Sequence, residues 1–338
     1  MAPAHFSIGI DLGTTNCALA FVPLGGEARS EIFGIQQWDT SSTITEVPGL
    51  PSFLYLPDQA TAAQIQAGNN ADEEWVVGRL ARKKAAESPG RVVHSAKSWL
   101  CHHTSDRLAG LLPWGSEDIA RDRKISPVRA SALMLDHLRR AWNSRFASAG
   151  VEFEFDWQKI TVTVPASFDA AAQRLTLTAA LEAGFPETIH LLEEPQAAFY
   201  CWLEQHDIAA DLESRLTDET DRTHHLLVVD VGGGTSDFSL FEFCSAPSGT
   251  ASKIKRIAVG DHILLGGDNV DLAIAHSSNR GSLASAGNFP GHSGMTSSPV
   301  AGISRRTCSR VTAIRGSALR SRCPAGELVW SRGHIRPS

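Results

Sequence analysis

The sequence of 338 residues has no apolar run that approaches the ~18 residues a membrane-spanning helix needs. Its six cysteines are scattered without a CxxC pair, which favours free thiols in a reducing compartment over a disulfide framework. Residues 1–5 lack the basic region of a signal peptide. A net charge of −6 gives no reason to expect nucleic acid or an anionic membrane as a partner. We therefore expect a cytoplasmic protein with neither of these partners.

Residues 277–338 lack lysine, have one acidic residue (Glu327) and show no helical or strand periodicity. The same segment has nine arginines and thirteen serines, and so carries a charge of about +8. One interpretation is a disordered basic arm that contacts nucleic acid or acidic partners. The other is a stretch never selected as protein, for example because the reading frame shifts after about His276. The simultaneous loss of lysine, aspartate and periodicity favours the second, and we expect no folded domain there.

Residues 1–276 have the pattern of an α/β protein. A chain of this length exceeds the usual limit of one core, so two lobes are expected. Ser126-Pro127 supplies an N-cap and a first helical residue, and an apolar stripe at helical spacing continues to Phe146. Strands are expected at residues 160–164 and 189–192, and helices at about 170–183 and 197–205. Residues 206–225 are polar and charged, which indicates a surface insertion.

Two turns about two hundred residues apart nearly repeat each other. Each runs from a short apolar strand into aspartate, glycine and threonine: residues 8–16 and residues 228–237. Glycine lets the backbone N–H groups approach a ligand, and successive N–H groups form an anion-binding concavity. An aspartate at the strand end can hold a hydrated Mg²⁺. Two such turns that face each other would bind a polyphosphate and its metal from both sides.

Seven motifs in order give the chain a specific resemblance. They are residues 8–16 (the first phosphate turn), residues 77–78 with the basic run 82–84 (the segment of a catalytic lysine), residues 95–100 (an "IKR-L" element), residues 163–168 (an interlobe strand and its switch proline, Pro165), residues 194–198 (a "NEPTAA" connector), residues 230–237 (the second phosphate turn) and residues 266–271 (a "GGEDFD" element). Over residues 6–275 the chain resembles the nucleotide-binding domain of the DnaK-type heat shock protein 70 family.

The resemblance implies an α/β, actin-like ATPase (ribonuclease H-like) fold with lobe I complete and lobe II partial. Lobe I would cover residues 1–225, the start of lobe II residues 226–276, and the tail residues 277–338. In the family, the rest of lobe II includes a "GGxxR-P" turn that encloses the adenosine, and a peptide-binding β-sandwich and helical lid follow. None of these is readable in residues 277–338, so we expect no client-peptide domain in this chain.

The resemblance also implies ATP/ADP and Mg²⁺ as cofactors. Asp11 and Asp230 would orient the Mg²⁺ through its waters; the alternative for each is an Asx-type cap of its own turn. The other nucleotide-binding positions are Gly13, Thr14, Thr15, Asn16, Gly232, Gly233, Gly234, Thr235, Gly266 and Gly267, which would donate hydrogen bonds to the phosphates. Tight-turn geometry is the other role of these glycines, and it is compatible with binding.

The catalytic group implied by the resemblance is Glu194, Thr14, Asp230 and Arg82. Glu194 would couple the nucleotide state to the interlobe contact and help to place the attacking water. Its alternative role is a solvated carboxylate before a helix N-terminus. Arg82 stands where the family has a lysine that contacts the phosphates. Arginine is not equivalent to lysine, because its planar guanidinium fork and the length of its side chain place the hydrogen-bond donors differently. Hydrolysis is therefore less firmly implied than ATP binding.

The leading hypothesis is an ATP-binding, Mg-dependent ATPase domain of a DnaK-like chaperone, impaired by the loss of its adenosine clamp. Its partners would be the nucleotide and co-chaperones or nucleotide-exchange factors. One alternative is a non-enzymatic interaction fragment. Another is a sugar-kinase-like phosphotransferase of the same superfamily, which is disfavoured by the Glu194-Pro195-x-Ala-Ala match.

Overall fold

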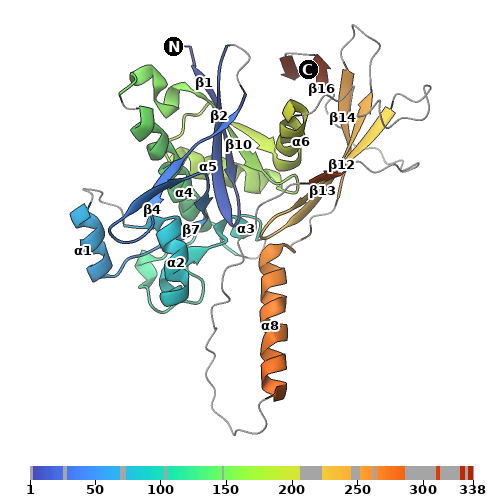
Figure 1. Cartoon of the computed structure of the whole chain (residues 1–338). Helices are drawn as coiled ribbons and strands as arrows, with labels where there is room; N and C mark the ends of the chain where they lie inside the picture. The colour runs from blue at the N-terminus through green and yellow to red at the C-terminus, as the bar shows by residue number, and fades with distance from the viewer. Residues whose placement is uncertain are drawn as a thin grey trace.

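The computed structural model shows a mixed α/β protein whose described residues include two large β-sheets (Figure 1). It describes residues 3–25, 29–68, 74–102, 105–146, 148–205, 223–244, 252–260, 263, 265–285, 310–312, 328–331 and 334–337. We refer to the described elements up to helix α6, which ends at Gln205, as lobe I, and to those from strand β12, which begins at Thr223, as lobe II.

The lobe I sheet has the strand order β11-β10-β1-β2-β3, with β6 also paired to β2. Strands β1 and β2 form an antiparallel hairpin, while β1, β10 and β11 are parallel neighbours. Parallel strands end at the same edge of a sheet, so the carboxyl ends of these three bring Asp11, Val164 and Glu193 to one edge. The strands are β1 (Phe6–Leu12), β2 (Asn16–Pro23), β3 (Glu31–Ile32), β6 (Leu50–Pro51), β10 (Lys159–Val164) and β11 (His190–Glu193).

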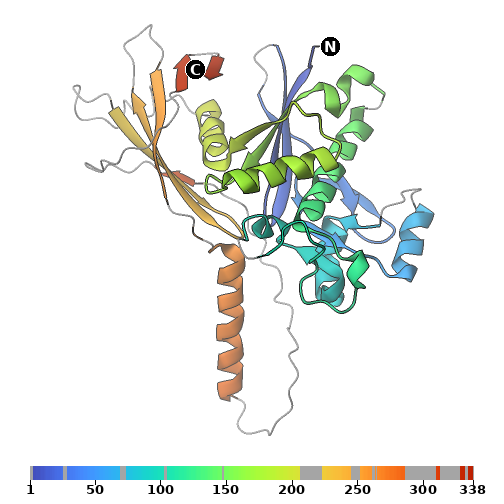
Figure 2. The ribbon, with the colours of Figure 1, turned by 180° about the vertical axis from the view of Figure 1, so that it is seen from behind.

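Helices α4 (Pro127–Phe146) and α5 (Ala170–Glu182) supply the layer that packs on this sheet (Figure 2). The predicted start of α4 is confirmed, because the Ser126 hydroxyl accepts a hydrogen bond from the Arg129 N–H at 3.0 Å. The apolar stripe of α4 points into the core, where Leu135, Leu138 and Trp142 are fully buried. Burial of this stripe holds the hairpin of β1 and β2, and therefore the first glycine turn, in place.

A second part of lobe I carries two small sheets and several short helices. Its sheets pair β4 with β5, and β7 with β8 and β9. The elements are β4 (Ile35–Trp38), β5 (Ile44–Val47), β7 (Phe53–Tyr55), α1 (Gln59–Gly68), β8 (Val76–Val77), α2 (Arg79–Glu87), β9 (Val92–His94) and α3 (Ala96–Trp99), with 3₁₀ turns at Pro89–Arg91, Arg121–Arg123, Val151–Phe153 and Phe155–Trp157.

The lobe II sheet is antiparallel around β12 and β13, and helix α6 packs on it. Phe199 of α6 stacks on Phe241 of β13 with a centroid distance of 4.9 Å, so the helix that leaves lobe I buries its apolar face against lobe II. Helix α6 spans Glu194–Gln205, and the lobe II elements are β12 (Thr223–Val231), β13 (Ser236–Cys244), β14 (Ser252–Val259), α8 (Gly267–Ser285), β15 (Arg310–Thr312), β16 (Leu328–Ser331) and β17 (His334–Pro337).

Three boundaries differ from those expected. Helix α6 begins at Glu194 instead of Ala197, because proline is tolerated in the first turn of a helix. Residues 223–225 belong to β12, whose ladder with β13 extends to Thr223 and Cys244, and the rest of the expected insertion lies outside the described residues. Helix α8 continues past residue 276 to Ser285, and short strands follow, whereas no helical or strand periodicity was expected there; the absence of a folded domain in residues 277–338 stays a prediction. The other tail residues lie outside the described part of the chain.

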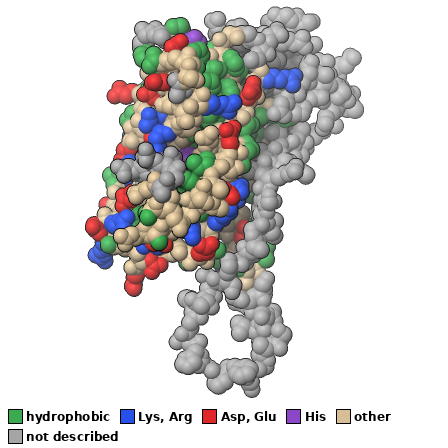
Figure 3. Space-filling view, turned by 60° about the vertical axis from the view of Figure 1, so that its left-hand side comes forward, with side chains coloured by type: hydrophobic (Ala, Val, Ile, Leu, Met, Phe, Trp, Pro, Cys, Tyr) green, Lys and Arg blue, Asp and Glu red, His purple; other side chains and the backbone are tan. Residues whose placement is uncertain are grey.

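One face of lobe I presents mixed charge. Figure 3 shows acidic and basic side chains interspersed over this face instead of one continuous basic patch. Within the described residues, no helix is both long enough and apolar enough to span a bilayer.

Candidate functional site

The first glycine turn is held by Ser52, which lies in none of the seven sequence motifs. Its hydroxyl donates to the Gly13 carbonyl at 2.7 Å, and its N–H donates to the Thr15 carbonyl at 2.9 Å. The turn is also sterically tight, since a Cβ on Gly13 would lie 2.1 Å from the Asn16 carbonyl oxygen. The turn between β1 and β2 therefore has one backbone conformation, which fixes where its N–H groups point.

The second turn is supported by the start of α8. The Gly267 N–H donates to the Gly232 carbonyl at 2.9 Å, and the Asp268 N–H donates to the Gly233 carbonyl at 2.8 Å. A Cβ on Gly266 would lie 2.4 Å from the Gly233 carbonyl oxygen. The predicted elements at residues 230–237 and 266–271 therefore form one packed unit.

The two turns meet face to face. A Cβ on Gly233 would lie 2.3 Å from Thr15 Cγ2, and a Cβ on Gly234 would lie 3.2 Å from Thr14 Cγ2. Contacts this short are possible only because both positions lack a side chain. The structure thus brings together the two predicted glycine turns, which lie about two hundred residues apart in the sequence.

Carboxylates gather at the strand ends beside these turns. Asp11 Oδ1 accepts a hydrogen bond from the Thr163 hydroxyl at 3.0 Å, which fixes its orientation toward β10. Burial raises the pKa of Asp230, and the negative charges of Asp11 and Asp237 raise it further. The excess of negative charge here is the environment in which a divalent cation is favourable.

The cation beside these carboxylates is Lys97 of α3. Its side chain is 6% exposed, and its ammonium donates to Glu194 Oε1, which is itself 17% exposed. Its charge also acts on Asp11 and Asp230. Lys97 lies inside the motif at residues 95–100, so the sequence carried a signal for this residue, although that motif alone predicted no role for it.

Glu194 is expected to titrate near neutral pH in the nucleotide-free protein. Burial raises its pKa to about 7, against the opposing effect of Lys97, which lowers it; Asp11 raises it further. Replacing Lys97 by methionine removes the lowering effect, so we expect the Glu194 pKa to rise above 7 in that variant. Carboxyl NMR of ¹³C-labelled protein measures both values, and an unchanged pKa in Lys97→Met would contradict the ion pair.

Arg82 is not brought to this centre. Its side chain is exposed on α2, and within the described residues it makes no ion pair or side-chain hydrogen bond. Its neighbours Arg79 and Lys83 both pair with Asp39, at 2.8 and 2.9 Å. Arg79 and Lys83 of α2 therefore contact the loop after β4.

Next to the Lys97–Glu194 pair, an ion pair between Arg256 and Glu193 joins the two lobes. Arg256 Nη2 of β14 donates to Glu193 Oε1 at 3.1 Å, and the other guanidinium nitrogen also contacts this carboxylate. Glu193 ends β11 and Glu194 begins α6, so this pair ties the lobe II sheet to the backbone that carries Glu194.

The residues present fit a hydrated Mg²⁺ better than a directly ligated ion. No cluster of three or more His, Cys, Asp or Glu side chains among the described residues could ligate a metal directly. Asp11 and Asp230 lie near enough for their charges to interact, with Lys97 as the nearby cation. A Mg²⁺ that keeps its waters could be held by such a pair, because it needs only one or two carboxylates besides phosphate oxygens.

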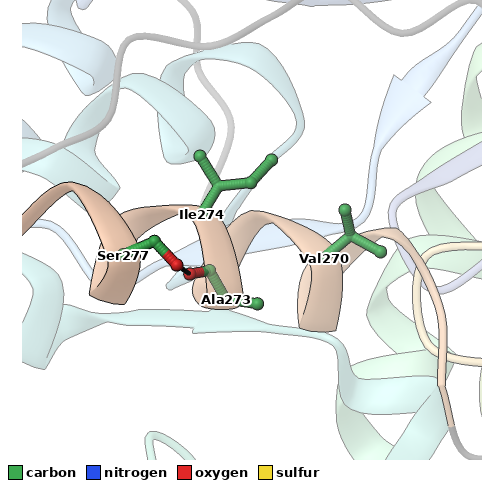
Figure 4. Close-up of a pocket in the computed structure, with 4 residues that line it drawn as sticks. All are labelled: Val270, Ala273, Ile274 and Ser277. Atoms are coloured by element: carbon green, nitrogen blue, oxygen red, sulfur yellow. Dashed lines mark hydrogen bonds between the residues drawn. The ribbon is translucent and has the colours of Figure 1, made fainter.

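Two hollows lie near these elements. One, of about 260 Å³, borders the paired turns and is lined by Ser98, Cys101, His102, Gly234, Asp268 and Asn269. The larger, of about 540 Å³, runs along α8 (Figure 4). Its lining side chains come from one helix, and the Ser277 hydroxyl there is already bonded to the Ala273 carbonyl at 2.9 Å. Of these two hollows, the first is therefore the one that borders the candidate site.

A family model described as "Hsp70 protein" matches residues 60–280, about two thirds of the chain. The chain belongs to the Hsp70 family. The match begins before α2 and includes the second turn and the start of α8, so it covers lobe I from α1 onward together with the described core of lobe II. The Hsp70 resemblance expected from the motifs is thus confirmed.

Similar Hsp70 chaperones come from several bacteria. The chain is 26% identical over 277 residues to "Chaperone protein DnaK 3" of Synechococcus sp., with 79% of this chain and 34% of the relative covered. It is 29% identical over 284 residues to "Chaperone protein HscA" of Enterobacter sp. (strain 638), with 80% and 37% covered. A "Chaperone protein HscA homolog" of Pseudomonas putida is 30% identical over 282 residues, with 80% and 37% covered. The chain spans about a third of the length of these relatives.

Proposed function

We propose that the chain binds ATP with Mg²⁺ between its two lobes and hydrolyses it, as the nucleotide-binding part of a chaperone-type ATPase. The observation that carries this proposal is the face-to-face contact of the two glycine turns, at Thr15 and Gly233. Backbone N–H groups in such turns bind phosphate oxygens without any charged side chain. Membership of the Hsp70 family supports the same function.

Each group would have a separate task. The turns would hold the β- and γ-phosphates, and Asp11 and Asp230 would hold the waters of the Mg²⁺. Glu194 would accept a hydrogen bond from the attacking water. Phosphoryl transfer needs little covalent help from a protein, so positioning and charge neutralisation supply most of the rate. Binding of co-chaperones or nucleotide-exchange factors belongs to this proposal, as does a weakened affinity for the adenosine part of the nucleotide.

Mg-ATP is expected to stabilise the wild-type protein and not the variant Gly233→Ala. A ligand present at about 100 times its Kd adds ~2.7 kcal/mol to the free energy of unfolding. In the variant, the new Cβ would lie 2.3 Å from Thr15 Cγ2, so the turns must move apart. Thermal unfolding and titration calorimetry with millimolar Mg-ATP measure both effects.

The matched control is Gly49→Ala, where a new Cβ has nothing within 4 Å. This variant should keep the wild-type response to Mg-ATP. An absence of binding heat and of stabilisation in the wild type would overturn the proposal and favour a non-enzymatic interaction fragment. Production of ADP that depends on an added sugar would favour the kinase alternative.

A further inference from the structure

We propose that the hollow beside the paired turns binds the nucleoside part of the nucleotide, with the base stacked on His102 and Trp99. The inference rests on the proposed function and names where the rest of the nucleotide lies once the turns hold its phosphates. Two observations carry it: the hollow of about 260 Å³ begins at the second turn, and a stack of aromatic rings reaches its wall. Neither residue belongs to the "GGxxR-P" turn that the resemblance assigns to adenosine.

The hollow shares a residue with the phosphate turns. Gly234 of the second turn lines the hollow, and a Cβ on Gly234 would lie 3.2 Å from Thr14 Cγ2 of the first turn. The backbone N–H groups of such turns are the groups that bind phosphate. A ligand that fills both the turns and the hollow must therefore join a phosphate chain to a second, bulkier part. A nucleoside triphosphate has this form.

The wall of the hollow suits an uncharged group better than further phosphate. Ser98 and Cys101 contribute a hydroxyl and a thiol, and burial raises the pKa of Cys101 to about 12, so this thiol is neutral. Asp268 of α8 contributes a carboxylate, and none of the described residues that line the hollow is a lysine or an arginine. A carboxylate repels phosphate, whereas it accepts hydrogen bonds from ribose hydroxyls in other nucleotide sites.

Contacts within the protein hold the two sides of the hollow in place. The Ser95 hydroxyl, just before α3, donates to Asp268 Oδ2 of α8 at 3.1 Å, so the start of α3 is tied to the start of α8 (Figure 1). Asn269 Oδ1 accepts a hydrogen bond from the Gly266 N–H at 2.9 Å. The hollow is therefore formed by the folded chain itself, as is usual for small-molecule sites.

The aromatic stack consists of Trp114, Trp99 and His102. Trp99 contacts Trp114 at a centroid distance of 5.1 Å and His102 at 5.3 Å, with 27° between the planes of Trp99 and His102. A hydrogen bond of 3.0 Å joins His102 Nδ1 to the Ser105 hydroxyl, which fixes the orientation of the imidazole. Of these three aromatic residues, His102 is the one that lines the hollow. A base that enters the hollow would extend this stack.

This mode of binding predicts weak selectivity between bases. Stacking uses the π face that every base has, and it does not read the hydrogen-bonding edge of the base. We therefore expect the wild-type protein to bind Mg-ATP and Mg-GTP with Kd values within about threefold of each other, as for a stacking platform.

The test compares the Kd of Mg-ATP with that of Mg-tripolyphosphate, which lacks the nucleoside, by titration calorimetry. The wild type should bind ATP about tenfold more tightly, the contribution of one base–aromatic stack. In His102→Ala the Kd of ATP should rise about tenfold for the same reason, while the Kd of tripolyphosphate should stay unchanged. His102→Phe keeps an aromatic ring and should retain most of the ATP affinity.

The matched control is His94→Ala. His94 also stacks on an aromatic ring, that of Phe53 at a centroid distance of 5.8 Å, and its Nδ1 is hydrogen-bonded to the Ser95 hydroxyl at 3.2 Å. It is not one of the residues that line the hollow. This variant should bind ATP and tripolyphosphate like the wild type.

The outcomes separate this inference from the proposed function. Equal affinities of the wild type for ATP and tripolyphosphate would overturn the nucleoside site while ATP binding stands. The same holds if His102→Ala binds ATP like the wild type, or loses affinity for both ligands equally, because the change would then concern the turns. A large preference for ATP over GTP would contradict stacking as the mode of binding. A wild type that binds neither ATP nor tripolyphosphate removes the proposed function itself.

Discussion

Replacing Glu194 by glutamine is expected to lower ATP turnover about a thousandfold, within the range of one general acid–base group. The change keeps the size of the side chain but removes the charge that Lys97 contacts and the oxygen that can take a proton from water. A thousandfold loss equals ~4 kcal/mol of transition-state stabilisation. ATP binding should weaken far less, because the turns make those contacts. Single-turnover kinetics and calorimetry separate the two effects.

Glu193→Gln is the matched control for this variant. Glu193 is the adjacent residue, and its carboxylate contacts Arg256 instead of Lys97. We expect its turnover to fall less than tenfold, through a weaker interlobe contact. Equal losses in Glu193→Gln and Glu194→Gln would show that general negative charge, and not the Glu194 position, matters.

Turnover should also fall as the pH drops below about 7. The ionised form of Glu194 is the one that can accept a proton, and its pKa in the nucleotide-free protein is about 7. Lowering the pH protonates the carboxylate and removes the base. In Glu194→Gln this acid limb of the pH profile should disappear along with most of the activity.

Trp142→Ala is expected to cost ~3–5 kcal/mol of unfolding free energy, which is typical of a fully buried tryptophan. Trp142 is 0% exposed, its indole N–H donates to the Phe153 carbonyl at 2.9 Å, and its ring packs edge-on against Phe6 and Phe21. Phe6 and Phe21 belong to β1 and β2, so the loss would loosen the hairpin that carries the first turn. Denaturant unfolding followed by circular dichroism measures the change.

Trp114→Ala provides the comparison for this prediction. Trp114 is 65% exposed and contacts Trp99 at a centroid distance of 5.1 Å. We expect a loss of about 1 kcal/mol or less, as for an exposed aromatic pair. If the two variants were equally stable, the aromatic cluster around Trp142 would not be the core of lobe I.

Much of lobe I was predictable because its signals are local. The turn at residues 8–16, which joins β1 to β2, and the capped helix from Ser126 follow from a short apolar strand, a glycine turn and an N-cap, all within a few residues. The ends of α6 and α8 were less well predicted. The start of α6 was ambiguous, because a proline in that position is compatible with both a loop and the first turn of a helix. In α8, the hydrogen bond from the Ser277 hydroxyl to the Ala273 carbonyl is a polar contact, so it does not appear as apolar periodicity in the sequence.

By itself, the sequence determined the family and the two glycine turns. The backbone conformations that such turns require restrict residue types at each position, and their order along the chain is specific. Only the tertiary structure decided which side chains complete the centre. Lys97 and Glu194 are 97 residues apart, and Ser52 is 39 residues from Gly13. Contacts over such separations depend on how α3, β6 and α6 pack, so the sequence marked Arg82 while the fold brings Lys97 to the carboxylates.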